Sequence, residues 1–436
     1  MTIDKTTSKL ELKEVVAMGV GAMVGGGIFS VLGLAISQAG HAAPLAFALG
    51  GAIALLTGVS YTHLGLTFRS DGGSFTYLEQ AFRHPNIAGL GGWLLLVGYI
   101  GTLSLYAYTF GTYGSALLGS GNNPAVHHLL ASLVLLAFLG INLYGVKETG
   151  TAELVIVTVK VLILLLFAII GLTNVHSDHL LPLFDKGEVG VIMGAALIFV
   201  AYEGFELIPN AVNEMQRPQR DLKHGILLSV LITMIIYVLV SLVAVGNLAP
   251  QEISRYGEYA LAEAARPFLG QAGFVLIGVA ALFSTSSAIN ATLFGTARLG
   301  MEMSKKKELP HVFSLRRQQN HIPWASLLII TAVTLLFVNA ADLTIISSFA
   351  SSTFLLIFFA INLSAWRLRT RIGLRGLWPL TAMLLSMASW LVLMFWLWRD
   401  KPHSLYWIGL FYLSVVVAEL LFSMRRRILK PAGSPC

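Results

Sequence analysis

Long runs of apolar residues, separated by short polar segments, fill this sequence from about residue 15 to residue 424. About 20 apolar residues in a helix cross the core of a bilayer, and the runs have about that length. The pattern predicts twelve membrane-crossing helices. Their expected ranges are 15–37, 44–68, 87–118, 127–144, 150–173, 189–210, 225–247, 271–299, 323–340, 343–366, 376–398 and 404–424. The mildly apolar segment Tyr256 to Leu269 is expected to form a surface helix in a long loop.

The composition agrees with a membrane protein and disagrees with a soluble one. The chain is 56% hydrophobic and 12% charged, whereas soluble domains carry about 25% charged residues. The single cysteine, Cys436, excludes an intramolecular disulfide and a cysteine metal site. Neither a nucleophile with its base nor a metal-binding cluster is visible in the sequence. We therefore expect no enzyme activity, no metal and no cofactor.

The basic residues are divided unequally between the two faces that this threading creates. With both termini in the cytoplasm, most of the 29 lysines and arginines lie on the cytoplasmic side. The outer face then holds Lys186, Arg255, Arg266, Arg399 and Lys401. This asymmetry predicts cytoplasmic tails at residues 1–14 and 425–436, in the cell's inner or plasma membrane. Because the positive charge faces the inner leaflet, no nucleic acid is needed to explain it.

The first and sixth predicted spans are interrupted near their middle. The first contains GVGAMVGGGIF over residues 19–29, and the sixth contains AYEGFE over residues 201–206. Glycine costs about 1 kcal/mol relative to alanine in a helix, and a mid-membrane acid costs roughly 2.5–3.5 kcal/mol. Close packing of helices through small residues is the alternative explanation, but three consecutive glycines exceed what packing needs. Interrupted helices at matching positions predict two inverted repeats of five spans, 15–173 and 189–366, followed by two further helices over 376–424.

An unwound helix exposes backbone groups that lipid cannot satisfy, so these groups must line a cavity. The N–H groups that start the second half-helix, with the helix dipole behind them, suit a carboxylate. The freed carbonyl groups on the preceding half suit an ammonium group. Together they match the two charged groups of an amino acid.

Several motifs carry a resemblance to a known family. They are GAMVGGGIF at 21–29, DGGSFTY at 71–77, GVKETG at 145–150, FVAYEGFE at 199–206, LFSTSSAINA at 282–291 and ELP at 308–310. In this order and spacing they resemble the amino acid–polyamine–organocation (APC) superfamily of permeases, from about residue 10 to residue 366. The likeness is strongest to its ApcT-like, sodium-independent and proton-coupled amino-acid transporters. It implies the LeuT-type five-plus-five fold, with helices one and six unwound at the midplane.

The resemblance also implies roles for backbone groups in the two interruptions. Gly25, Gly26 and Gly27 would offer N–H groups to the substrate carboxylate. Met23 and Ala201 would offer carbonyl groups to the substrate ammonium group.

Three side chains of the sixth span would complete this site. Phe199 would close over the substrate as an aromatic lid, while Tyr202 and Glu203 would line the pocket. Glu203 departs from many relatives, which have a neutral residue at this position. It is either a second proton site or a substrate contact, and it favours a cationic substrate as the alternative.

Lys160 lies inside the fifth span with apolar residues on both sides. Without the resemblance, it reads as a lysine that faces a water-filled crevice or pairs with Glu153. The resemblance instead implies that its ammonium replaces a sodium ion, near the Gly21 carbonyl and the hydroxyl groups of Ser284 and Ser286. Gain and loss of its proton would then couple transport to the proton gradient.

The sequence therefore predicts a secondary active transporter of amino acids, proton-coupled and sodium-independent, with alternating access around a midplane site. Its partners would be an amino-acid substrate, protons and the lipid bilayer. Exchange of polyamines or cationic amino acids is the alternative within the same class. A nutrient sensor that does not transport is the alternative from another class.

Overall fold

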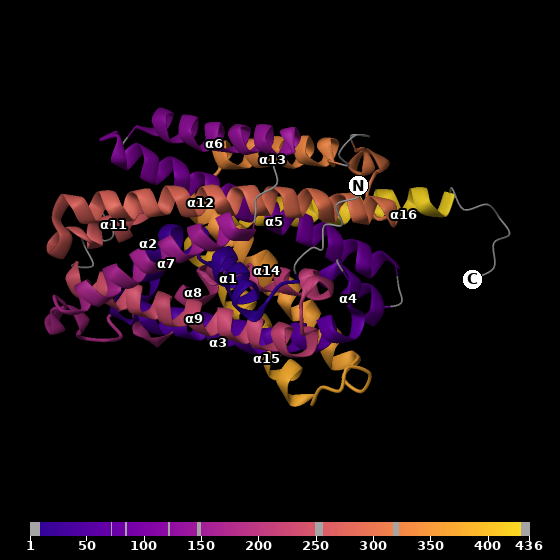
Figure 1. Ribbon diagram of the computed structural model, residues 1–436, viewed down its shortest axis with the longest axis horizontal. Coiled ribbons are helices and arrows are strands. Elements are labelled where there is room, and N and C mark those ends of the chain that lie inside the picture. The colour runs from indigo at the N-terminus through magenta and orange to yellow at the C-terminus, as the bar shows by residue number, and fades with distance from the viewer. Residues whose placement is uncertain are drawn as a thin grey trace, which may run out of the picture.

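The computed structural model describes residues 9–70, 72–82, 85–120, 123–145, 150–248, 256–316 and 322–428. Within these ranges the structure is helical, and the only β-pairing is an isolated bridge between Leu10 and Met215. Most helices run along the long axis of an elongated bundle (Figure 1). The predicted all-helical class is confirmed. Residues 1–8 and 429–436 of the two predicted tails, and Arg255, lie outside the described residues.

The long helices follow the predicted apolar runs closely. They are α3 (Ala43–Phe68), α5 (Pro85–Leu117), α6 (Pro124–Tyr144), α7 (Gly150–Leu172), α9 (Pro218–Asn247), α12 (Arg266–Lys305), α13 (Trp324–Ala340), α14 (Leu343–Arg367), α15 (Leu377–Asp400) and α16 (Pro402–Ile428). Shorter elements between them are η1 (Gly40–Ala42), α4 (Gly73–Ala81), η2 (Ser177–Leu180) and η6 (His311–Ser314). By length and composition, nine helical stretches of the described chain can cross a membrane, and ten if a bent pair counts as one span.

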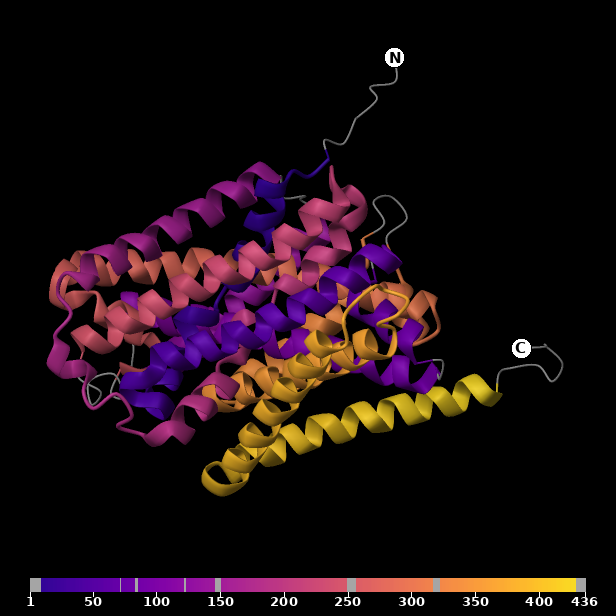
Figure 2. The ribbon, with the colours of Figure 1, turned by 90° about the horizontal axis from the view of Figure 1, so that it is seen from below.

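The outer surface of the bundle is strongly apolar. Leu162 on α7, Leu336 on α13 and Leu410 on α16 are 58%, 73% and 61% exposed. The last helix, α16, lies along the outside of the bundle (Figure 2). Exposed apolar side chains recur along the length of these helices. Isolated apolar residues are common on soluble surfaces, but rows of them along whole helices mark contact with lipid. The chain is an integral membrane protein.

Two helices are broken where the sequence places its glycines and acids. The first break separates α1 (Leu12–Met23) from α2 (Gly27–Ala39). The second follows α8 (Gly187–Leu197), and the chain continues as η3 (Phe199–Tyr202) and η4 (Phe205–Glu214) after a bend of 51°. Gly204 joins η3 to η4 with φ at +120°, a conformation that residues with a Cβ rarely adopt.

The segment that precedes α12 differs from the prediction. Residues 256–265 form η5 (Gly257–Tyr259) and α11 (Ala260–Ala264), and every residue of α11 is buried. The prediction of a surface helix over Tyr256–Leu269 is therefore wrong for residues 260–265, whereas Arg266 and Pro267 at the start of α12 are exposed. Three of the five residues in α11 are alanines, so this short helix packs closely against α2, α9 and α12.

Candidate substrate site

The two helix breaks face each other in the interior of the bundle. A Cβ atom built on Gly27 would lie 2.7 Å from the Cα atom of Ala201. A Cβ atom built on Gly204 would lie 2.6 Å from the Cβ atom of Ala22 and 3.0 Å from the backbone nitrogen of Met23. Only glycine permits so close an approach at both points. The backbone groups freed by one break are thus brought next to those freed by the other.

The first turn of α2 begins at this meeting point. Gly27 is the first residue of α2, and the N–H groups of a helix's first turn have no acceptor within the helix. Tyr106 of α5 packs against the neighbouring glycines, since Cβ atoms built on Gly25 and Gly26 would lie 3.2 Å and 2.4 Å from its ring. The predicted carboxylate-binding residues are therefore together, at the start of a helix and under an aromatic ring.

Carbonyl groups on both breaks accept hydrogen bonds from one tyrosine. The hydroxyl group of Tyr237, on α9, lies 2.6 Å from the Met23 oxygen and 3.1 Å from the Ala201 oxygen. These are the two carbonyl groups predicted to face the substrate ammonium group. The sequence reasoning missed Tyr237, although a single tyrosine in the aliphatic run ITMIIYVLV was a visible signal.

Lys160 binds the helix that precedes the first break. Its side chain is 2% exposed, and its Nζ atom donates to the Gly21 oxygen over 2.7 Å. The hydroxyl group of Ser284, on α12, donates to the Val24 oxygen. Side chains of α7 and α12 thus bind one carbonyl group in the last turn of α1 and one in the first break.

Ser286 is not part of this arrangement. It lies two residues beyond Ser284 on α12, which turns it by about 200° around a helix of 3.6 residues per turn. Its side chain is partly exposed on the other side of the helix. Of the two predicted serines, only Ser284 contacts the first break.

The predicted side chains of the second break point in different directions. Phe199 packs edge to face against Phe358 of α14, with 5.5 Å between ring centroids. Tyr202 donates its hydroxyl group to the Phe47 oxygen of α3 over 2.6 Å, away from the first break. Its ring still lies 5.4 Å from that of Tyr237. Phe199 therefore packs on α14, while Tyr202 presents its ring, and not its hydroxyl group, to Tyr237.

Two buried acids of this break are held by α5. Glu203 is 4% exposed and accepts a hydrogen bond from the Thr102 hydroxyl group. Glu206 accepts from the Tyr99 hydroxyl group at 3.3 Å and from the Gly204 backbone nitrogen at 2.6 Å. Glu206 therefore closes the turn at Gly204, which gives it a structural role. The hydrogen bond to Glu203, in contrast, comes from a side chain of α5 and not from the backbone of the turn.

Serines on α14 satisfy the backbone groups at the end of α8. The Ser351 hydroxyl group donates to the Leu197 oxygen over 2.7 Å and accepts from the Val200 nitrogen over 3.0 Å. Ser347 donates to the same Leu197 oxygen over 3.1 Å. These bonds stabilise the second break without a ligand. Among the described residues, no group of three histidine, cysteine or acidic side chains could hold a metal ion.

Comparison with known proteins gives one consistent picture. Residues 10–420 match the model of the family described as amino acid permease. An uncharacterized protein of Methanocaldococcus jannaschii is 34% identical, over 95% of each chain. The inner membrane transport protein YbaT of Escherichia coli is 30% identical, over 94% of this chain and 96% of its own. The methylthioribose transporter of Bacillus subtilis is 30% identical, over 68% of this chain and 67% of its own.

Proposed function

The chain belongs to the amino acid permease family of the APC superfamily, and from this premise we propose that it is a proton-coupled, sodium-independent transporter of amino acids. The family makes it a transporter rather than an enzyme. The amino-acid substrate is proposed from the geometry of the two breaks, and the proton coupling from the buried Lys160. The observation that carries the proposal is that the freed backbone groups of both breaks meet at one buried place.

We also propose the five-plus-five fold with twelve spans. The first repeat, 15–173, would comprise the broken pair α1 and α2, then α3, α5, α6 and α7. The second repeat, 189–366, would comprise the broken stretch from α8 to η4, then α9, α12, α13 and α14, with α15 and α16 following. The 17 residues of α13 extend roughly 25 Å, which is close to the thickness of a bilayer core. The distribution of basic residues supports cytoplasmic tails.

In the proposed site, a zwitterionic amino acid bridges the two breaks. Its carboxylate would accept from the N–H groups of Gly25, Gly26 and Gly27, at the positive end of the α2 dipole. Its ammonium group would donate to the oxygens of Met23 and Ala201, in place of the Tyr237 hydroxyl group or beside it. Phe199 and Tyr202 would enclose the side chain.

Lys160 is the proposed proton-responsive group. Its ammonium form links α7 to α1 just before the first break, through the Gly21 oxygen. Loss of the proton removes this charge-assisted bond and frees α1 to move. The driving force is adequate, because one unit of pH gradient supplies about 1.4 kcal/mol per proton and 100 mV supplies about 2.3 kcal/mol per charge.

A cationic substrate is the second candidate, and Glu203 is the observation that favours it. Its buried carboxyl group lies in the second break and is held by one threonine. A carboxylate at this position, with lone pairs that Thr102 does not use, suits a second ammonium or guanidinium group on the substrate. The protein would then exchange cationic amino acids or polyamines across the membrane.

Uptake into proteoliposomes tests the proposal. Labelled amino acids and polyamines are supplied in sodium-free buffer, with and without an inward proton gradient, to wild type and Lys160→Ala. Lys186→Ala, which removes an exposed lysine, is the control. Gradient-driven amino-acid uptake should survive in the control, while Lys160→Ala should lose the dependence on the gradient.

Other outcomes would revise the proposal in defined ways. Gradient-driven uptake that persists in Lys160→Ala would move the coupling proton to Glu203. Uptake of polyamines alone would select the cationic candidate. Folded protein that shows neither uptake nor counterflow of any substrate would refute transport and favour the alternative of a nutrient sensor.

A further inference from the structure

The outer segment, residues 256–265, is wedged between α2 and α5. A Cβ atom built on Gly33 of α2 would lie 1.9 Å from the Gly257 oxygen, so no larger residue fits there. Further along α2 toward the break, the hydroxyl groups of Ser30 and Thr109 form a hydrogen bond that joins α2 to α5. The segment therefore packs against α2 beyond the Ser30–Thr109 bond, on the side away from the first break.

Glu258 is the residue that attaches this segment to α5. Its carboxyl group accepts from the Tyr108 hydroxyl group over 2.7 Å and from the Thr112 hydroxyl group over 3.2 Å. Thr112 also lies 3.3 Å from Nδ1 of His127 on α6, and the His127 ring packs on Tyr108 with 4.3 Å between centroids. A carboxyl group on the segment, two hydroxyl groups and an imidazole thus form one connected group.

Among the described residues, the other charges near Glu258 do not neutralise it. Asp342, the N-cap of α14, adds a like charge, and Arg266 forms an ion pair of 2.6 Å with Glu263. Burial raises the pKa of the Glu258 carboxyl group above its ordinary value, and Asp342 raises it further, against the opposite effect of the two hydroxyl groups. The closed segment therefore holds a proton on this group more tightly than water-exposed glutamate does.

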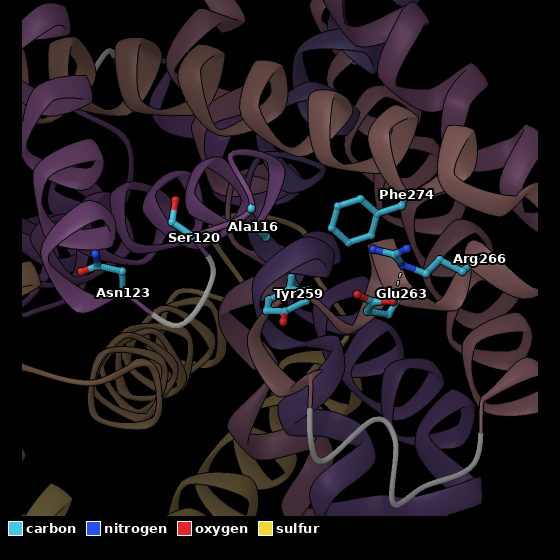
Figure 3. A pocket seen from close by; sticks show the side chains of 8 residues that line it. Ala116, Ser120, Asn123, Tyr259, Glu263, Arg266 and Phe274 are labelled. Carbon is cyan, nitrogen blue, oxygen red and sulfur yellow. Dashed lines mark ion pairs between the residues drawn. The ribbon is translucent and has the colours of Figure 1, made fainter.

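The segment has space on its other side. A cavity of about 500 Å³ lies between Tyr259 and Glu263 of the segment and Ala116 and Ser120 near the end of α5. Figure 3 shows these side chains around it, with the ion pair between Glu263 and Arg266 at one edge. Unfilled volume beside a short buried segment allows the segment to move without displacing a packed core.

We propose that Glu258 is an external proton site, and that a proton bound there favours closure of the outer segment over the path to the substrate. The proposal rests on the proposed function, in which the outer end opens to admit substrate. The proton passes from external water to the carboxylate when the segment is open. In the closed state the protonated carboxyl group stays within hydrogen-bond distance of the Tyr108 and Thr112 hydroxyl groups.

The direction of the pH effect follows from linkage. Because the carboxyl group binds a proton more tightly when buried, lowering the external pH favours the closed state. The preference for closure is lost as the pH rises through the raised pKa. Between the pKa values of the open and closed states, the ratio of closed to open molecules changes by up to about tenfold per pH unit.

Labelling of a cysteine beneath the segment measures this ratio. In a Cys436→Ser background, Ser30→Cys places a thiol inward of the segment, and a membrane-impermeant thiol reagent is added to intact cells at several values of external pH. Thiol ionisation rises with pH in every variant, so the labelling rate is compared with that of Glu258→Gln at the same pH. Glutamine cannot ionise and represents the protonated, closed form.

The expected result is a wild-type rate that rises above the Glu258→Gln rate as the pH increases, by up to about tenfold per unit. Glu258→Asp should restore the pH dependence, and Glu263→Gln, on the same segment, should retain it. A constant ratio of wild type to Glu258→Gln, or faster labelling of Glu258→Gln at all pH values, would overturn the inference. The experiment uses no substrate, so absent amino-acid uptake would refute the proposed function separately.

Discussion

The spacing between the two helix breaks is tested most directly by Gly27→Ala. The added methyl group would lie 2.7 Å from the Cα atom and 2.9 Å from the Cβ atom of Ala201. Carbon atoms in ordinary contact are about 3.5–4.0 Å apart. The two breaks must therefore separate by roughly 1 Å, because a backbone carbon cannot rotate out of the way. The substitution keeps the N–H group, so it changes the spacing of the site without removing a donor.

The cost can be placed within limits. Adding a methyl group to a close-packed interior costs about 1–3 kcal/mol. With about 1.4 kcal/mol per factor of ten, this weakens the closed, substrate-binding arrangement by roughly 5- to 150-fold. A displacement of about 1 Å at a site costs a factor of about 100, which falls in the same range. We therefore expect the KM for amino-acid uptake to rise by one to two orders of magnitude.

Uptake by reconstituted protein, over a range of substrate concentrations in sodium-free buffer, measures the change. The matched control is Gly295→Ala in the interior of α12, where an added Cβ atom meets no heavy atom within 4 Å. That variant should transport normally, and alanine should stabilise its helix by about 0.4–1 kcal/mol. A folded Gly27→Ala protein with wild-type KM would show that the breaks do not form the substrate site.

Two further predictions concern buried hydrogen bonds. Tyr237→Phe leaves two site carbonyl groups without their donor, at a cost of about 1–3 kcal/mol. Because the substrate ammonium group can donate to these carbonyl groups, substrate should raise the melting temperature of the variant more than that of wild type. Tyr113→Phe should lose stability without this larger shift, since its hydroxyl group bonds Phe29 instead, and equal shifts would contradict the reasoning. Asn362→Leu removes the bonds from α14 to Ser60 and Thr57 on α3, and thermal unfolding should show a loss of about 1–3 kcal/mol. An unchanged melting temperature would refute that role.

The positions of the helices and of their breaks could be predicted from the sequence. Apolar runs determine where helices form in lipid, and glycines and acids mark where a helix cannot continue as usual. Lys160 could be connected to Gly21 only through the family resemblance, since 139 residues separate them. The sequence placed Ser284 and Ser286 together, whereas the turn of α12 separates them.

The missed features depend on contacts between distant segments. Tyr237 reaches carbonyl groups on two other helices, and nothing next to it in the chain indicates this. The charged residues Glu258, Glu263 and Arg266 predict a surface helix over Tyr256–Leu269, but the alanines of α11 allow residues 260–265 to be buried. Composition describes a segment's average polarity, and burial depends on which neighbours the fold supplies.

The bridge between Leu10 and Met215 joins the two broken helices through backbone hydrogen bonds, which do not depend on the identity of the side chains. The Leu10 nitrogen donates to the Glu214 oxygen over 2.8 Å, and the Gln216 nitrogen donates to the Leu10 oxygen over 2.9 Å. Any residue except proline supplies these groups. Backbone hydrogen bonds therefore join the start of α1 to the end of η4, and the side chains at these positions can change during evolution while the bonds persist. Because backbone groups place few demands on residue type, a comparison of sequences would not reveal this link.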